Sequence, residues 1–227
     1  DANTTGVRNT AIGMNALSAN TTADNNTALG QGSMYLNTTG NENTAVGKSS
    51  LDANTTGDYN TAVGKDALGA NTTASNNTAV GIHALTLNTT GDVNVAVGAY
   101  SLDNNTTGSS NTAIGRAALD SNTTGSENTA VGRQAMQANT TGVRNTALGS
   151  YAGDSITTSE KNTIVGSYAG NAITTGDGMN VCIGYDAGDS ITTGNRNVCV
   201  GTNANPNVVA GSRQYVFGHD ITGKGDN

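Results

Sequence analysis

The chain has 227 residues and a formal net charge of −7, and it contains 31 glycines but one proline, one phenylalanine and no tryptophan. Such a chain lacks the large apolar residues that fill a globular core of this length, and its acidic balance argues against a nucleic-acid-binding face, which would be basic. No apolar run approaches the length of a membrane-spanning helix, so we expect no membrane insertion.

A single short pattern repeats along the chain. An Asn opens each repeat, and these residues lie 17 apart, with one step of 18. They are Asn9, Asn26, Asn43, Asn60, Asn77, Asn94, Asn111, Asn128, Asn145, Asn162, Asn180 and Asn197. A period this regular indicates a stack of similar units. Because the chain starts in the second half of a repeat, we expect it to be a fragment of a longer protein, with any targeting signal outside it.

The first five positions of each repeat predict a strand. Counted from the opening Asn, position 2 is Thr or Val, position 3 is Ala, Ile or Cys, position 4 is Val, Ile or Leu, and position 5 is Gly. This order is typical of a short strand that ends at a glycine turn. Seventeen residues are too few for a helix pair or a propeller blade. We therefore predict an all-β fold, a parallel β-solenoid of about 12 coils with a four-residue strand and a second short strand in each coil.

A large apolar side chain stands at position 9 in most repeats and at position 12 in three of the last ones. Position 9 is Leu or Met until the last repeats, where it becomes Gly and position 12 changes from Asn to Ile. The exchanged residues are Gly153, Gly170 and Gly188 at position 9 and Ile156, Ile173 and Ile191 at position 12. Both positions should therefore face one interior. The Asn at position 12 would stack on its copies about 4.8 Å away and form a buried amide ladder. Although Asn-Thr-Thr matches the N-glycosylation acceptor, an inward Asn would not be accessible to it.

The remaining positions are predicted to lie on the surface, and one inserted residue and two cysteines interrupt the pattern. Positions 6, 7, 16 and 17 vary among charged and polar residues, as an exposed edge would. The one extra residue lies in 175–179 and is expected on an outward loop. Cys182 and Cys199 occupy position 3 of successive repeats. Parallel stacked side chains rarely give the torsion of a disulfide, so we expect free, buried thiols.

The strand is apolar at both position 3 and position 4, although successive residues of a strand face opposite sides. A strand that is apolar on both faces is buried on both. We predict that the small residues at position 3, such as Ala62, pack against other copies of the chain in a parallel homotrimer. Ala62→Glu should then prevent assembly. A dimer is the alternative.

These motifs carry a resemblance. Asn-Thr-Ala-Val-Gly, an Ala-Leu pair and Asn-Thr-Thr-Gly resemble the shaft repeats of phage tail-fibre and bacterial tail-fibre-domain surface proteins, over residues 1–201. Residues 202–227 form an atypical coil and the start of a shorter repeat, spaced by 13 from Gln214 to Asn227, which is similar to the head repeats of YadA-like trimeric adhesins. The resemblance implies a trimeric, left-handed parallel β-roll. The period of 17 departs from the YadA-like pattern, and no chaperone domain is matched.

No residue constellation for chemistry stands out. His83 and His219 are solitary, without a metal-ligand or triad partner at a recognisable spacing. The glycine pairs in 176–178 and 223–225 lack the flanking strand and helix of a phosphate loop. We therefore predict no catalytic, cofactor-binding or metal-binding residues, no cofactor, and a chain that is not an enzyme.

Two surface patterns have alternative interpretations. Tyr100, Tyr151 and Tyr168 share position 7, with Tyr185 beside them at position 6, and this row is either a glycan-binding surface or ordinary exposed tyrosines. Lys48 and Lys65, and likewise Arg116 and Arg133, recur at position 6. They mark either an anion site or solvated edge charges.

The sequence predicts a structural shaft of an extracellular or virion fibre that holds a tip domain away from a surface. A cell-surface glycan or receptor would bind to that tip, outside this fragment. The alternatives are an ice-binding solenoid, suggested by the Thr columns at positions 13 and 14, and a spike that binds or degrades polysaccharide. The latter would need paired carboxylates about 5 to 9.5 Å apart.

Overall fold

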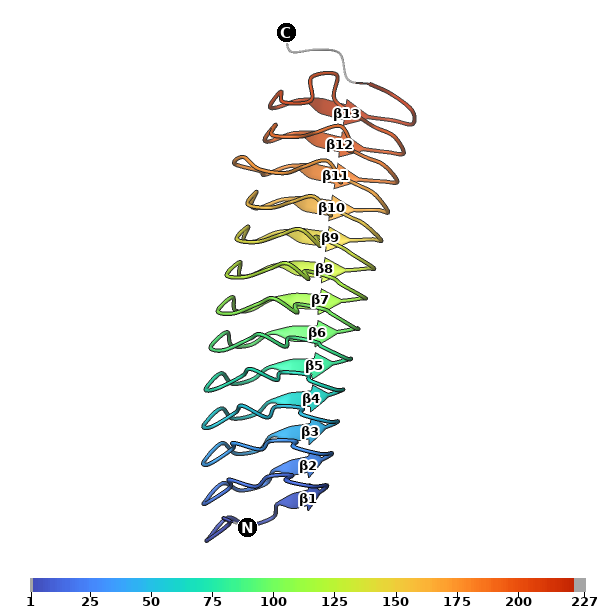
Figure 1. The fold of residues 1–227 in the computed structure, drawn as a ribbon. Helices are drawn as coiled ribbons and strands as arrows, with labels where there is room; N and C mark the ends of the chain where they lie inside the picture. Colours follow the sequence, from blue (N-terminus) through green and yellow to red (C-terminus); the bar gives the residue numbers. More distant parts are fainter. Residues whose placement is uncertain (1, 223–227) are drawn as a thin grey trace. The chain divides into compact units, whose positions relative to one another are not determined.

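A computed structural model describes residues 2–222, which fall into two compact units that divide after Asn111. Each unit is a parallel β-solenoid with one coil per repeat and one strand per coil (Figure 1). The described residues contain no helix. The all-β solenoid with a period of 17 residues, predicted from the repeat, is therefore confirmed.

The first unit contains six strands. They are β1 (Thr10–Ile12), β2 (Thr27–Leu29), β3 (Thr44–Val46), β4 (Thr61–Val63), β5 (Thr78–Val80) and β6 (Val95–Val97). Consecutive strands pair in parallel and in register, so that Ala45 lies beside Ala62. Each strand has three residues, not the four predicted, because Gly at position 5 leaves the extended conformation: Gly47 has a φ of +135°. A Cβ on Gly47 would lie 2.5 Å from the carbonyl oxygen of Gly64, which explains the glycine.

The second unit contains seven strands. They are β7 (Thr112–Ile114), β8 (Thr129–Val131), β9 (Thr146–Leu148), β10 (Thr163–Val165), β11 (Val181–Ile183), β12 (Val198–Val200) and β13 (Tyr215–Phe217). β13 pairs in register with β12. Gln214 stands where the earlier repeats have their opening Asn, and its backbone N–H donates to Oδ1 of Asn197 over 2.9 Å. The predicted turn at 223–225 and the end of the shorter repeat at Asn227 lie outside the described residues.

The second strand predicted for each coil does not form. The rest of the coil is a series of turns, because positions 7, 9 and 17 adopt left-handed backbone conformations: in one coil Asp66, Leu68 and Asn76 have φ values of +55°, +51° and +61°. The turns are still tied to the neighbouring coils by backbone hydrogen bonds. The N–H of Met34 donates to the carbonyl of Ser50 (2.9 Å), and that of Thr38 to the carbonyl of Thr55 (3.0 Å).

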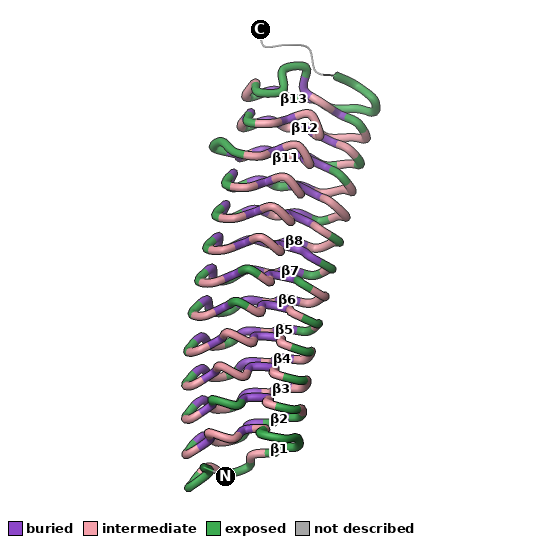
Figure 2. The backbone as a smooth tube through the Cα atoms, viewed as in Figure 1, coloured by how far each residue is buried: buried purple, intermediate pink, exposed green. Residues whose placement is uncertain are grey.

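The interior of each coil is filled by the chain's own side chains. Ala62 at position 3, Leu68 at position 9 and Asn71 at position 12 are all fully buried within a single chain. In Figure 2 the buried segments recur at the same places from coil to coil. The prediction that the face of Ala62 packs against other copies is therefore wrong. A small residue at position 3 leaves room for the Leu at position 9, and position 4 faces outward instead.

The amide ladder at position 12 is confirmed. Nδ2 of Asn54 donates to Oδ1 of Asn37 (2.8 Å), Asn71 to Asn54 (2.9 Å), and Asn88 to Asn71 (3.1 Å). Each Nδ2 also donates within its own coil, as Asn71 does to the carbonyl of Ala74 over 3.0 Å. The buried amides are thus paired without any charge, and the Asn side chains of these Asn-Thr-Thr triplets are shielded from solvent.

The ladder ends where Ile replaces Asn. Asn139 is the last Asn at position 12, and the next coil has Ile156, so Oδ1 of Asn139 is buried without a hydrogen-bond partner. The isoleucine fills the volume that Leu occupies elsewhere. A Cβ on Gly153 would lie 2.9 Å from Cδ1 of both Ile156 and Ile164. The predicted exchange between positions 9 and 12 therefore takes place in one shared interior.

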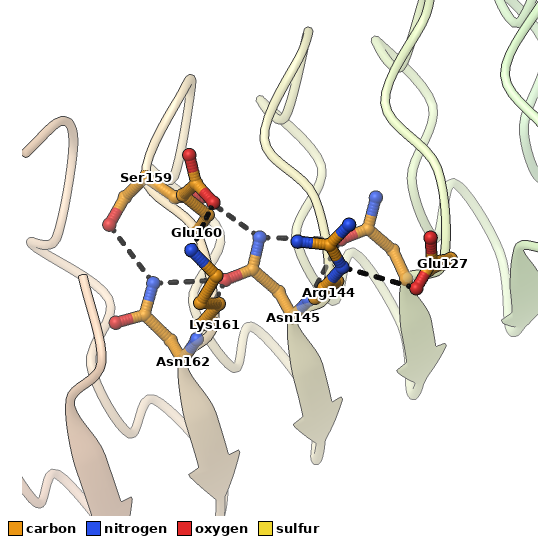
Figure 3. A network of polar contacts seen from close by, with 8 residues as sticks. Glu127, Arg144, Asn145, Ser159, Glu160, Lys161 and Asn162 are labelled. Atoms are coloured by element: carbon orange, nitrogen blue, oxygen red, sulfur yellow. Dashed lines mark hydrogen bonds and ion pairs between the residues drawn. The ribbon is translucent and has the colours of Figure 1, made fainter. Parts of the chain in front are cut away.

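Within each unit a second amide ladder, which was not predicted from the sequence, runs through the opening Asn residues of the repeats. Oδ1 of Asn43 accepts the backbone N–H of Asn60 (2.8 Å), while Nδ2 of Asn43 donates to the carbonyl of Gly57 (2.8 Å). Figure 3 shows the variant next to the insertion, where Nδ2 of Asn162 donates to Oδ1 of Asn145 (2.9 Å) and to Oγ of Ser159 (3.0 Å). The occurrence of Asn at position 1 in all twelve repeats was the available signal.

The extra residue is accommodated as predicted. Thr175, Gly176 and Asp177 are exposed, whereas Gly178 and Asn180 are buried again. The insertion therefore protrudes from its coil, and the strand that follows it, β11, pairs in register with β10.

Candidate interaction surfaces

The outer face of the strands carries no charge and is aliphatic at position 4. Positions 2 and 4 flank the inward position 3 and face outward, and position 4 is Val, Ile or Leu in every repeat. Leu29 is 44% exposed and Val80 36% exposed in the first unit, and Ile114 is 40% exposed in the second. Positions 2 and 4 carry no charged residue in any of the twelve repeats. Each unit therefore presents an uncharged, largely aliphatic stripe, which we call the strand face.

The paired threonines at positions 13 and 14 have different surroundings. The hydroxyl of Thr38 donates to the carbonyl of Thr55, and that of Thr55 to the carbonyl of Thr72, each over 3.0 Å. The Thr at position 14, such as Thr39, is exposed. The position 13 hydroxyls are therefore committed to links between coils and do not form a free outward rank.

Position 16 does not vary freely, contrary to the sequence prediction. The backbone N–H of Asp24 donates to Oδ1 of Asn41 (2.8 Å), that of Asn41 to Oδ1 of Asp58 (2.6 Å), and that of Asp58 to Oγ of Ser75 (3.0 Å). A short side chain with an oxygen acceptor satisfies a backbone donor of the previous coil. Position 16 is restricted to Asp, Asn and Ser through much of the first unit, and this restriction could have revealed the role of its side chain.

His83 is not solitary in the structure. Its ring stacks on Tyr100 of the next coil, with centroids 5.4 Å apart, and its Nε2 lies 3.8 Å from Oδ2 of Asp66 in the previous coil. Asp66 also pairs with Lys65 over 3.1 Å. His219, at the other end of the chain, pairs with Asp220 over 2.9 Å. These groups are partly or largely exposed, and contacts of this kind at the surface have small energetic weight.

The aromatic row of the second unit stacks on itself. The rings of Tyr151 and Tyr168 are nearly parallel with centroids 5.0 Å apart, and the guanidinium of Arg133 lies 5.1 Å from the Tyr151 ring centroid. Tyr185 meets Tyr168 edge-on at 6.2 Å. Because the ring faces of Tyr151 are shared with its neighbours, this row has little free face to offer to a sugar.

The two cysteines are free and buried, as predicted. They lie side by side in β11 and β12. Contact with the Cys199 thiol, together with burial, raises the pKa of Cys182 well above its ordinary value. Cys182 is therefore a protonated core thiol rather than a nucleophile.

Within residues 2–222 no three His, Cys, Asp or Glu side chains gather in a way that could hold a metal ion. None of these residues forms a helix that is long and apolar enough to cross a membrane. Comparison with known proteins gives no match: no family model, no curated protein and no solved structure is significantly similar to the chain. The resemblance to tail-fibre and YadA-like repeats stays a prediction.

Proposed function

We propose that the chain is the shaft of an extracellular fibre in which three copies pack in parallel along their strand faces. The observation that supports this proposal is the strand face itself, an uncharged stripe on the outside of each unit that is aliphatic at position 4 and Thr or Val at position 2. Soluble monomers rarely expose a continuous apolar patch of this kind. A second copy of the same chain has a stripe of the same period, so parallel packing would match the two coil by coil.

Three copies suit the shape of the coil better than two. Each coil presents one three-residue strand, and its remaining sides are turns that carry the charged residues. Three such narrow faces close around a common axis and cover one another. Two faces would leave the edges of each stripe, such as the exposed side of Leu29, in contact with water.

A shaft role also agrees with how the interior is built. The buried polar groups are neutral amides that pair with their own copies along the stack, so each coil supports the next. Such a repeat can be extended without changing its chemistry, which suits an element that sets a distance. In this proposal the receptor is bound by a tip that lies outside this part of the protein.

Sedimentation of the intact chain tests the oligomeric state. We expect a species of three times the chain mass of 22.6 kDa. Val63→Glu places a charge on the strand face and should abolish this species, because burial of an unpaired carboxylate is strongly unfavourable. Thr73→Glu, in the same repeat at the exposed position 14, is the matched control and should assemble normally.

A folded wild-type species at the mass of one chain would refute the trimer, and a species of twice that mass would establish the dimer. The earlier variant, Ala62→Glu, no longer tests assembly because Ala62 lies in the coil interior and its replacement would unfold the chain.

One observation favours a second function, ice binding. Thr at position 2 and the aliphatic residue at position 4 form two outward ranks on one face, separated by an inward residue, as in Thr61 and Val63 of β4. A flat face of this kind matches a regular surface better than the adjacent threonines at positions 13 and 14 do. Thermal hysteresis shown by a monomeric species would support ice binding and exclude the shaft.

A further inference from the structure

A hollow of about 200 Å³ opens on the outer surface of the first unit. It is lined by Gly32 and Tyr35 of one coil, by Lys48 and Asp52 of the next, and by Asn15 of the previous one. A larger hollow, of about 480 Å³, lies at the first coil and is lined by interior positions such as Leu17 and Asn20. That larger hollow is uncovered core and not a surface site.

Two departures from the repeat within a single coil produce the smaller hollow. Gly32 is the only glycine at position 7 in the twelve repeats, and Tyr35 is the only aromatic residue at position 10. A Cβ on Gly32 would meet only Oγ of Ser49, at 3.8 Å, so the space above this residue is open. The missing side chain creates the volume, and the tyrosine three residues later provides a wall.

We propose that this hollow binds a single pyranose ring of a carbohydrate. Tyr35 is 45% exposed and offers a ring to the apolar face of a sugar. Asp52 accepts hydrogen bonds from hydroxyls, Lys48 donates to them, and the amide of Asn15 can do both. This site goes beyond the shaft function proposed above.

The size and charge of the hollow favour a sugar over other ligands. Its volume is below the roughly 300 to 1,000 Å³ of pockets that take drug-sized molecules, so one ring fits. A phosphate group would be repelled by the carboxylate of Asp52, which lines the hollow beside Lys48. An apolar ligand would leave the polar groups around it unpaired. A neutral sugar ring can place its apolar face on Tyr35 and direct its hydroxyls to the polar groups of Asp52 and Lys48.

The hollow is independent of the strand face. Its lining comes from positions 6, 7 and 10, and contains no residue of positions 2 and 4. Assembly through the strand face would therefore leave the lining residues outside the interface. It would also bring three identical hollows into one particle, and such multivalency strengthens weak binding to a surface that displays many sugars.

Saturation-transfer difference NMR on the intact wild-type protein tests the proposal. The probes are the methyl glycosides of glucose, galactose, mannose and N-acetylglucosamine, each used up to about 100 mM because one ring binds weakly. At least one probe should receive saturation. Gly32→Tyr, which refills the hollow, and Tyr35→Ala, which removes its wall, should each weaken binding at least about tenfold, equivalent to about 1.4 kcal/mol.

Matched variants keep the result interpretable. His83→Tyr makes a comparable change at position 7 of another coil, where Tyr100 shows that tyrosine is accommodated, and Tyr59→Ala removes an exposed tyrosine elsewhere. Both should bind as the wild type does. The proposal is wrong if no probe binds, if binding survives both Gly32→Tyr and Tyr35→Ala, or if inorganic phosphate displaces the bound glycoside. If the wild-type protein binds a glycoside but sediments as a single chain, the proposed shaft function is refuted and the sugar site is not.

Discussion

At the scale of single residues, the interior is unusual in burying many amides in place of hydrocarbon. A lone buried Asn leaves several donors and acceptors unpaired, and each unpaired group costs about 1 to 3 kcal/mol. Repetition removes this cost, because Oδ1 of Asn54 accepts from Asn71 and Oδ1 of Asn71 accepts from Asn88. Where the repetition stops, one acceptor loses its donor: Oδ1 of Asn139 is buried without a hydrogen-bond partner.

The first prediction removes one member of the ladder. Asn71→Ala should lower the free energy of unfolding by about 1 to 3 kcal/mol, because Oδ1 of Asn54 then remains buried without a donor. Urea unfolding followed by circular dichroism measures the change. Thr73→Ala, at an exposed position of the same repeat, should change stability by no more than about 0.5 kcal/mol. Equal effects of the two substitutions would show that the ladder does not stabilise the coil.

At the scale of one coil, the left-handed backbone conformation at position 9 explains why Leu there can be exchanged for Gly when position 12 becomes Ile. Leu68 has a φ of +51°, a conformation that costs a non-glycine residue about 1 to 2 kcal/mol. Its burial in the core offsets that cost. In the last repeats Gly takes the left-handed position without strain, and Ile at position 12 fills the core from the opposite side.

The second prediction tests this exchange within one coil. Leu68→Gly alone should cost about 2 to 5 kcal/mol through the cavity it leaves, and Asn71→Ile alone should be destabilising because it competes with Leu68 for space and breaks the ladder. The double variant should be more stable than the sum of the single effects predicts, by about 1 to 3 kcal/mol. A double-mutant cycle in urea measures the coupling. Strict additivity would mean that the two positions do not share a volume.

The sequence predicts the repeat period and the packing inside the coil well, but it predicts the outward-facing surfaces poorly. The period, the glycine turns and the exchange between Leu68-type and Ile156-type residues all reflect packing that repeats, so they leave a pattern in the sequence. Which of two apolar neighbours faces inward leaves none, since Ala62 and Val63 are both acceptable in a core. The hollow at Gly32 also escaped prediction, because it arises from the absence of a side chain.

At the scale of the whole molecule, the buried polar side chains of the described residues are all uncharged. The hydrogen-bonded ladders at positions 1, 12 and 13 are neutral, and the ion pairs of the described residues, such as Arg144 with Glu127, lie on the surface. Because the chain has 17 acidic and 10 basic residues, repulsion among the carboxylates at neutral pH exceeds their attraction to the basic side chains. Acid should therefore affect this protein differently from proteins whose folded state depends on buried ion pairs.

The last prediction concerns this response to acid. Burial raises the pKa of Asp52, Asp154 and Asp189 above the ordinary value of 3.8. In the window between that value and the raised one, the folded chain holds more protons than the unfolded chain, so its stability rises as the pH falls. We expect a melting temperature at about pH 4 that is at least as high as at pH 7, at constant salt and protein concentration. Asp154→Asn should reduce the difference, because it removes one of the three groups. A melting temperature that falls steadily between pH 7 and pH 4 would contradict this prediction.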